Sequence, residues 1–257
     1  MNVLFIGDIV GREAAEWVVG CLPKLRQKHN VDLTIANAEN IAVSAASPFN
    51  GFGMSVDLVE MLFACGVDVI TSGNHAWDGP DVEQVHAHPR VLRPFNLPQG
   101  RPGKGLITIQ VAGESVTIVN VADKNAIPDA LPLEQVWAQL DLPGTVIVDF
   151  HGESAMQKHV LACALDGKVA AVLGTHTHEP TMFLHLSPVG TALVCDVGMT
   201  GPLGGVQGIS PAFFHDVFHG ADPAGLPPYM LATGPLTLGA VLLRITEGKT
   251  REIHRLE

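Results

Sequence analysis

The sequence predicts an α/β fold, because short apolar segments alternate with segments of helical periodicity along most of the 257 residues. Val3–Ile6 opens this pattern as a predicted strand, and Glu13–His29 follows it as a predicted helix. Strands joined through helices lie parallel, so we expect a mainly parallel sheet. Since no internal repeat and no linker divides the chain, residues 1–257 are expected to form a single domain.

The remaining elements follow from the same two periodicities. Apolar runs predict strands at Leu33–Ala36, Val67–Thr71, Thr145–Asp149 and Val169–Leu173, and a hairpin formed by Ile107–Val111 and Ser115–Val121. Helical spacing predicts helices at Val56–Cys65, Glu134–Leu140 and Ala155–Leu165. In the last third, shorter antiparallel strands are expected at Met182–Leu186, Thr191–Val194, Leu238–Ile245 and Thr250–Arg255. Residues 198–228 are rich in Gly, Pro and His, which indicates a long loop whose role the sequence leaves open.

Charge and composition exclude some classes of protein. A net charge of −11 argues against an extended nucleic-acid surface, although bound cations can reverse the charge locally and admit a small phosphorylated substrate. No apolar run approaches the ~18 residues of a membrane span, and the first one is too short for a signal peptide. The four cysteines are scattered, which is typical of buried reduced thiols. We therefore expect a cytoplasmic protein without a membrane anchor.

Polar side chains with metal-binding ability follow five of the predicted strands. They are Asp8; Asn37, Glu39 and Asn40; Asn74 and His75; His151; and His176 and His178. In an α/β sheet, ligands bind beyond the carboxyl ends of parallel strands, so these side chains are expected to converge. His176 and His178 are alternate residues, and in an extended segment such residues point the same way.

The residue types in this set indicate a catalytic metal centre. Imidazole, carboxylate and amide ligands suit iron, manganese or zinc, and the lack of cysteine argues against a structural zinc site. The set supplies about twice the ligands of a mononuclear site, which favours a pair of metals of the kind used in phosphoryl transfer. Glu39 is the predicted bridging carboxylate, because its side chain is long and lies between Asp8 and Asn74 in the chain.

Several motifs resemble those of calcineurin-like metallophosphoesterases, and in particular the YmdB-like branch, which is similar to 2′,3′-cyclic-nucleotide 2′-phosphodiesterases. They are Phe5-Ile6-Gly7-Asp8-Ile9-Val10-Gly11, Asn37-Ala38-Glu39-Asn40, Gly73-Asn74-His75-Ala76-Trp77-Asp78, Gly174-Thr175-His176-Thr177-His178 and Asp196-Val197-Gly198-Met199-Thr200-Gly201-Pro202. The resemblance runs from residue 1 to about residue 255. It implies a four-layer α/β/β/α sandwich.

The resemblance also implies a role for each of the site residues. Asp8, Glu39, Asn40 and His178 would hold the first metal ion, and Glu39, Asn74, His151 and His176 the second. His75 would stay off the metals as the acid that protonates the leaving oxygen. In two places the chain departs from the wider superfamily: Glu39 stands where Asp is usual, and Val10 stands where the first block usually has His. Iron is the metal we favour, ahead of manganese and zinc.

The function we expect is hydrolysis of phosphodiesters or phosphomonoesters, with 2′,3′-cyclic nucleotides as the favoured substrates and water activated by the two metal ions. One alternative is a general phosphomonoesterase. Another is a regulatory protein that binds a nucleotide with little turnover. We also expect a homo-oligomer, either a dimer or a tetramer.

Overall fold

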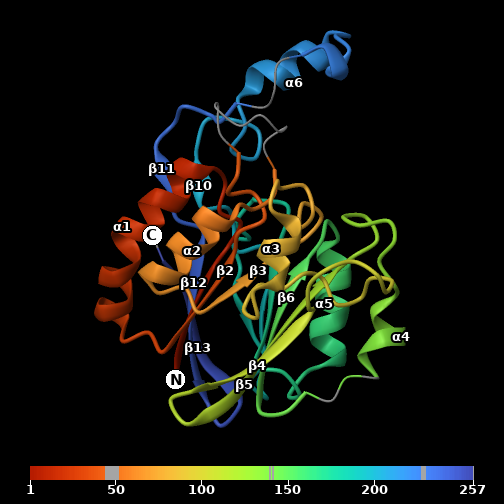
Figure 1. The fold of residues 1–257 in the computed structure, drawn as a ribbon. Coiled ribbons are helices and arrows are strands. Elements are labelled where there is room, and N and C mark those ends of the chain that lie inside the picture. Colours follow the sequence, from red (N-terminus) through yellow and green to blue (C-terminus); the bar gives the residue numbers. More distant parts are fainter. Residues whose placement is uncertain (44–51, 139, 141, 227–229, 257) are drawn as a thin grey trace.

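Two β-sheets stacked face to face form the centre of the molecule, and helices cover both outer faces (Figure 1). The computed structural model describes residues 1–43, 52–138, 140, 142–226 and 230–256. The helices are α1 (Arg12–His29), α2 (Val56–Cys65), α3 (Val82–Ala87), α4 (Leu133–Trp137), α5 (Ala155–Ala164) and α6 (Pro211–Phe218), with a 3-10 turn at Pro223–Gly225.

The first sheet has five strands in the order β13-β12-β1-β2-β3. They are β1 (Asn2–Ile6), β2 (Leu33–Asn37), β3 (Val69–Thr71), β12 (Ala240–Thr246) and β13 (Lys249–Leu256). The strands β1, β2 and β3 are parallel, whereas β12 runs antiparallel to β1 and β13 antiparallel to β12. The carboxyl ends of three strands therefore lie at one edge.

The second sheet has six strands in the order β4-β5-β6-β7-β9-β8. They are β4 (Leu106–Val111), β5 (Glu114–Ala122), β6 (Thr145–His151), β7 (Ala171–Thr175), β8 (His185–Leu186) and β9 (Ala192–Val194). The four central strands are parallel and the two edge strands antiparallel. A separate short pair joins β10 (Gly201–Pro202) to β11 (Leu236–Thr237).

Alternation along the strands produces the layers. In β1, Val3 and Phe5 face the core between the sheets, whereas Leu4 and Ile6 pack against α1 and α2. On the other side, Val148 and Phe150 of β6 belong to the core that α4 and α5 cover. The resulting order of helices, sheet, sheet and helices confirms the four-layer α/β/β/α sandwich.

Several element predictions need correction. The mainly parallel sheet expected from periodicity is two mixed sheets, because periodicity identifies a strand but not the strands beside it. The strand β9 pairs antiparallel with β8, as expected, but it also pairs parallel with β7. The strand β8 covers only two residues of its predicted range. The 198–228 segment contains α6, so it is not simply a loop; its last two residues lie outside the described part of the chain. Residue 139 of the predicted helix Glu134–Leu140 also lies outside it, and the helix observed there ends at Trp137.

Two further features concern the cysteines and the helices. All four cysteines are free, and Cys195 is buried, but Cys163 is exposed, so the expectation of four buried thiols is wrong. Among the described residues, no helix has both the length and the apolar character needed to span a bilayer.

Gly7, just after β1, provides a test of how closely the two sheets approach at the edge where the polar residues gather. A Cβ atom there would lie 2.0 Å from the carbonyl oxygen of Gly198. The Gly198 carbonyl is backbone and cannot move aside as a flexible side chain could. Gly7→Ala is therefore expected to lower the free energy of unfolding by about 1–3 kcal/mol in urea titrations. The control is Gly20→Ala within α1, where a Cβ meets nothing within 4 Å; it should raise stability by roughly 0.5–1 kcal/mol. Equal stability of the two variants would contradict the close approach.

Candidate metal centre

The predicted site residues do gather at one edge of the sandwich. Asp8 lies two residues after β1, Glu39 two residues after β2, and His176 directly after β7. His151 was expected just after its strand, but it is the last residue of β6 itself. Asp8, Glu39, Asn40 and His151 are almost fully buried, whereas the His176 side chain keeps 18% of its surface exposed.

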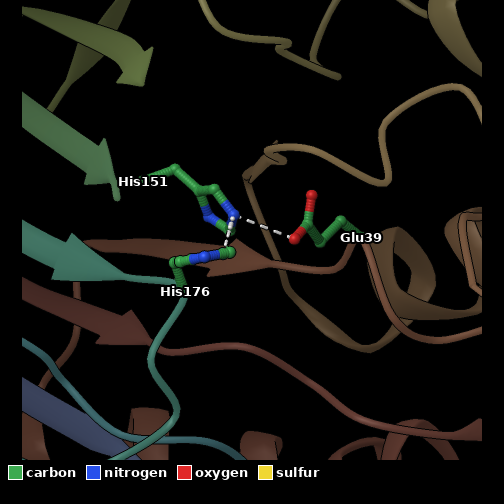
Figure 2. Close-up of side chains that lie close together, drawn as sticks. All are labelled: Glu39, His151 and His176. Carbon is green, nitrogen blue, oxygen red and sulfur yellow. Dashed lines mark hydrogen bonds and ion pairs between the residues drawn. The ribbon is translucent and has the colours of Figure 1, made fainter. Parts of the chain in front are cut away.

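Four polar atoms crowd around one point between the sheets. His151 Nε2 lies 3.0 Å from Glu39 Oε1 and 2.9 Å from His176 Nδ1 (Figure 2). It also lies 2.8 Å from Asn74 Oδ1. One ring nitrogen can donate at most one proton, so hydrogen bonding cannot satisfy all of these pairs. Ligand atoms that share a metal at ~2.1 Å stand roughly 3 Å apart. The arrangement therefore fits a transition-metal ion bound by two imidazoles and two oxygens.

A second group of ligand atoms lies beside the first. His178 Nε2 is 3.6 Å from Asp8 Oδ1 and 3.4 Å from Asn40 Nδ2. The oxygens Asp8 Oδ1 and Asn40 Oδ1 are buried and have no hydrogen-bond partner within the described residues. An unsatisfied buried acceptor costs about 1–3 kcal/mol, and a bound cation would remove that cost. This group also fits a metal ion.

Hydrogen bonds on the outer side of the rings orient all three histidines. His176 Nε2 contacts Glu153 Oε1 at 3.1 Å, and His178 Nδ1 contacts the Gln207 carbonyl oxygen at 3.1 Å. His151 Nδ1 contacts Thr175 Oγ1 at 3.0 Å. When such a ring is neutral, the nitrogen next to the acceptor carries its proton, and the lone pair is on the other nitrogen, the one that faces the cluster.

Electrostatics at the centre favour a positive charge. Burial alone would raise the pKa of Glu39, but the attraction of His151 and hydrogen bonds from His151 and His75 lower it to about 2. Burial would likewise lower the pKa of His151, yet Glu39 and Asp8 raise it to about 9. The pKa of His176 is lowered by burial and by the charge on His151. Glu39 is therefore ionised at neutral pH, and a metal ion would take the place of the proton that otherwise balances it.

The backbone around His176 and His178 differs from the extended segment that was expected. Both residues have positive φ, 99° and 64°, which is strained for a side chain other than glycine. Each consequently joins a different ligand group. Asp196 stabilises the turn between them by accepting hydrogen bonds from the Thr177 N–H at 3.0 Å and from Thr177 Oγ1 at 2.7 Å. The motif that begins at Asp196 was recognised in the sequence, but this role was not.

His75 lies beside the two ligand groups, and its contacts differ from those of the other site histidines. Its backbone N–H donates to Glu39 Oε2 at 2.9 Å, and its Nδ1 lies 2.7 Å from Asp78 Oδ2. Its ring stacks on Phe52 at a centroid distance of 4.0 Å. Asp78 and Phe52 were not predicted as its partners; the only available signal was an acidic residue three positions after the histidine.

Comparisons with known proteins show to which family the chain is similar. The sequence model of the family described as YmdB-like protein matches residues 4–256. The chain is 32% identical over 266 residues to the 2′,3′-cyclic-nucleotide 2′-phosphodiesterase of Bacillus subtilis (strain 168), with 100% of this chain and 96% of the relative aligned.

Two solved structures are similar to this chain in fold. A hypothetical protein from Thermus thermophilus has a TM-score of 0.88 at 34% identity, covering 98% of this chain and 97% of its own. A novel phosphatase from Mycoplasma pneumoniae has a TM-score of 0.83 at 28% identity, covering 99% and 92%. The predicted enzyme class, a metallophosphoesterase, is confirmed. The chain belongs to the YmdB-like protein family.

Proposed function

We propose that this protein hydrolyses 2′,3′-cyclic nucleotides at the 2′ ester bond with the help of two metal ions. The observation that carries the proposal is the orientation of the three histidines. The inner ring nitrogens of His151 and His178 face carboxylate or amide oxygens, and that of His176 faces His151 Nε2. The outer nitrogen of each ring is held by an acceptor. The choice of substrate is supported by the described activity of the Bacillus subtilis relative.

The two ligand groups support the division of the metal ligands. Asp8, Glu39, Asn40 and His178 would hold one ion; Glu39, Asn74, His151 and His176 would hold the other. When bound, such a pair of cations would lower the pKa of water and offset charge on the phosphoryl oxygens. The nitrogen and oxygen donors suit iron, which we favour, and also manganese or zinc.

The chain itself contributes orientation and a proton. The amide oxygen of Asn74 faces His151, which leaves its NH₂ group to donate to a non-bridging phosphoryl oxygen. His75 is the proposed acid. Its Nδ1 is engaged by Asp78 and its ring is held against Phe52, so Nε2 is the atom that gives the proton to the departing 2′ oxygen. The product is then a 3′-monophosphate.

The proposal is tested by a substrate panel on metal-free and metal-loaded protein. With Mn²⁺ present, 2′,3′-cyclic AMP should yield 3′-AMP faster than 3′,5′-cyclic AMP, 2′-AMP or p-nitrophenyl phosphate is hydrolysed. Removal of metal with a chelator should abolish turnover, and Mn²⁺ should restore it; a zinc- or iron-loaded sample gives the comparison between metals. Full activity in the chelated protein would contradict the metal centre.

A general phosphomonoesterase is the second candidate, and it is favoured by the similarity to the Mycoplasma pneumoniae protein described as a phosphatase. The same panel separates the two, because a monoesterase would hydrolyse 2′-AMP and p-nitrophenyl phosphate in preference to the cyclic ester. A regulatory protein would bind the cyclic nucleotide without consuming it.

The proposal extends to the setting of the reaction. The substrate is a small phosphorylated molecule, consistent with the net charge of −11, which disfavours extended nucleic acid. We further propose a cytoplasmic location and a homo-oligomer.

A further inference from the structure

Asp149 is a fully buried carboxylate beneath the metal centre that none of the steps above uses. It lies on β6 and is 0% exposed, and no lysine or arginine of the described residues forms an ion pair with it. Alternation along the strand places Asp149 on the same face as Ile147 and His151, toward the first sheet. A buried carboxylate is costly unless hydrogen bonds satisfy it, so its partners identify what it does.

The partners of Asp149 lead directly to two proposed metal ligands. Thr175 Oγ1 donates to Asp149 Oδ1 at 2.7 Å, and His151 Nδ1 lies 3.0 Å from the same Thr175 oxygen. On the other side, Asn37 Nδ2 donates to Asp149 Oδ2 at 3.3 Å, and Asn37 Oδ1 accepts the backbone N–H of Glu39 at 3.2 Å. Asp149 is thus linked to His151 of the second sheet through Thr175, and to Glu39 of the first sheet through Asn37.

The direction of these hydrogen bonds is fixed by the number of protons. An ionised carboxylate only accepts, so the single hydroxyl proton of Thr175 goes to Asp149. The Thr175 oxygen can then act toward His151 only as an acceptor, which requires the proton of a neutral His151 ring to be on Nδ1. That leaves the lone pair on Nε2, the atom that faces Glu39, Asn74 and His176.

We propose that Thr175 and Asp149 are positioning residues that hold His151 in the tautomer and orientation required to bind a metal ion. The inference rests on the proposed metal centre. Residues that orient a metal-binding histidine typically change metal affinity about 10- to 100-fold when they are removed. The rival explanation is a purely structural tie between the sheets, made through Asn37.

The test compares two replacements of Thr175, using Mn²⁺ alone as the probe. Thr175→Val keeps the shape but removes the hydroxyl, and it should weaken Mn²⁺ binding, measured by electron paramagnetic resonance, by about 10- to 100-fold. Thr175→Ser keeps the hydroxyl and should restore wild-type affinity and kcat/KM. If the valine variant fails to fold, Thr175→Cys, whose thiol is a weak hydrogen-bonding group, should show the same loss relative to Thr175→Ser.

Thr191→Val is the matched control, because Thr191 lies in the same sheet just before β9, at the end away from the site. Its buried hydroxyl also makes two hydrogen bonds: it accepts one from the Gly167 N–H at 2.9 Å and donates one to the Val169 carbonyl oxygen at 2.7 Å. This variant should lose stability to denaturant but keep its Mn²⁺ affinity. Unchanged affinity in Thr175→Val, or an equal loss in Thr191→Val, would overturn the inference. Wild-type protein that binds no Mn²⁺ would overturn the proposed metal centre instead.

Discussion

Glu39→Gln is expected to remove bound metal and phosphoesterase activity together. Glu39 is 1% exposed, its Oε1 lies 3.0 Å from His151 Nε2, and its pKa of about 2 keeps it ionised at neutral pH, since the effects of His151 outweigh those of burial. Glutamine has a similar shape but no charge, and it offers only one oxygen for a bridge between two cations. The loss of metal affinity should therefore exceed the ~10- to 100-fold loss typical of residues that merely contact a ligand.

Metal content by mass spectrometry and thermal unfolding with added Mn²⁺ would measure this loss. A metal that binds only the folded state raises its stability, so the melting temperature of the wild type should rise with Mn²⁺ concentration and that of Glu39→Gln should not. Glu153→Gln is the control: it also removes a carboxylate 3.1 Å from a site histidine, but from the 54%-exposed rim. Its metal affinity should fall by at most about 10- to 100-fold, because glutamine still offers an acceptor to His176 Nε2. If Glu39→Gln retained two metal ions and full turnover, Glu39 would not be the bridge.

The sequence was most informative where one local rule decides the outcome. The residues that follow parallel strands must lie at one edge of a sheet, so Asp8, Glu39, His151 and His176 were expected to converge before any pairing of strands was known. The same rule does not say how many sheets there are. The number of sheets depends on which buried faces pack together, and the strands of the two sheets have similar apolar sequences.

The supporting residues were not predicted, because nothing periodic marks them. Asp149 reads as the polar end of a strand, yet it contacts Asn37, which lies 112 positions away on the other sheet. Asp196 was visible in a motif, but its contact with Thr177 exists only because the backbone turns at two residues of positive φ. Hydrogen bonds between sheets depend on tertiary packing, which neither secondary-structure propensity nor residue spacing predicts.

His75→Ala is expected to retain metal and to lose turnover of 2′,3′-cyclic AMP by about 10²- to 10⁴-fold, the usual contribution of a general acid. The ring contacts Phe52 and Asp78, and only its backbone N–H contacts a proposed metal ligand, Glu39. Alanine keeps that N–H. Metal content should therefore match the wild type, and this distinguishes the variant from Glu39→Gln.

The nature of the leaving group gives a sharper test of the same residue. A ribose 2′ oxygen must be protonated as it departs, whereas p-nitrophenolate is stable as an anion. Hydrolysis of bis(p-nitrophenyl) phosphate should consequently fall much less in His75→Ala than hydrolysis of 2′,3′-cyclic AMP. Asp78→Asn, which keeps an acceptor beside Nδ1 but loses the charge, should lie between the wild type and His75→Ala on the cyclic substrate.

His88→Ala supplies the structural control, because it also deletes a histidine ring stacked on a phenylalanine, Phe63, at 4.3 Å. It should leave turnover of both substrates unchanged. An equal loss on both substrates in His75→Ala would mean that the residue positions the phosphate and does not act as the acid. Unequal loss together with full metal content would place the proton transfer on His75, since the metal content excludes a missing metal ion and a disturbed fold would slow both substrates alike.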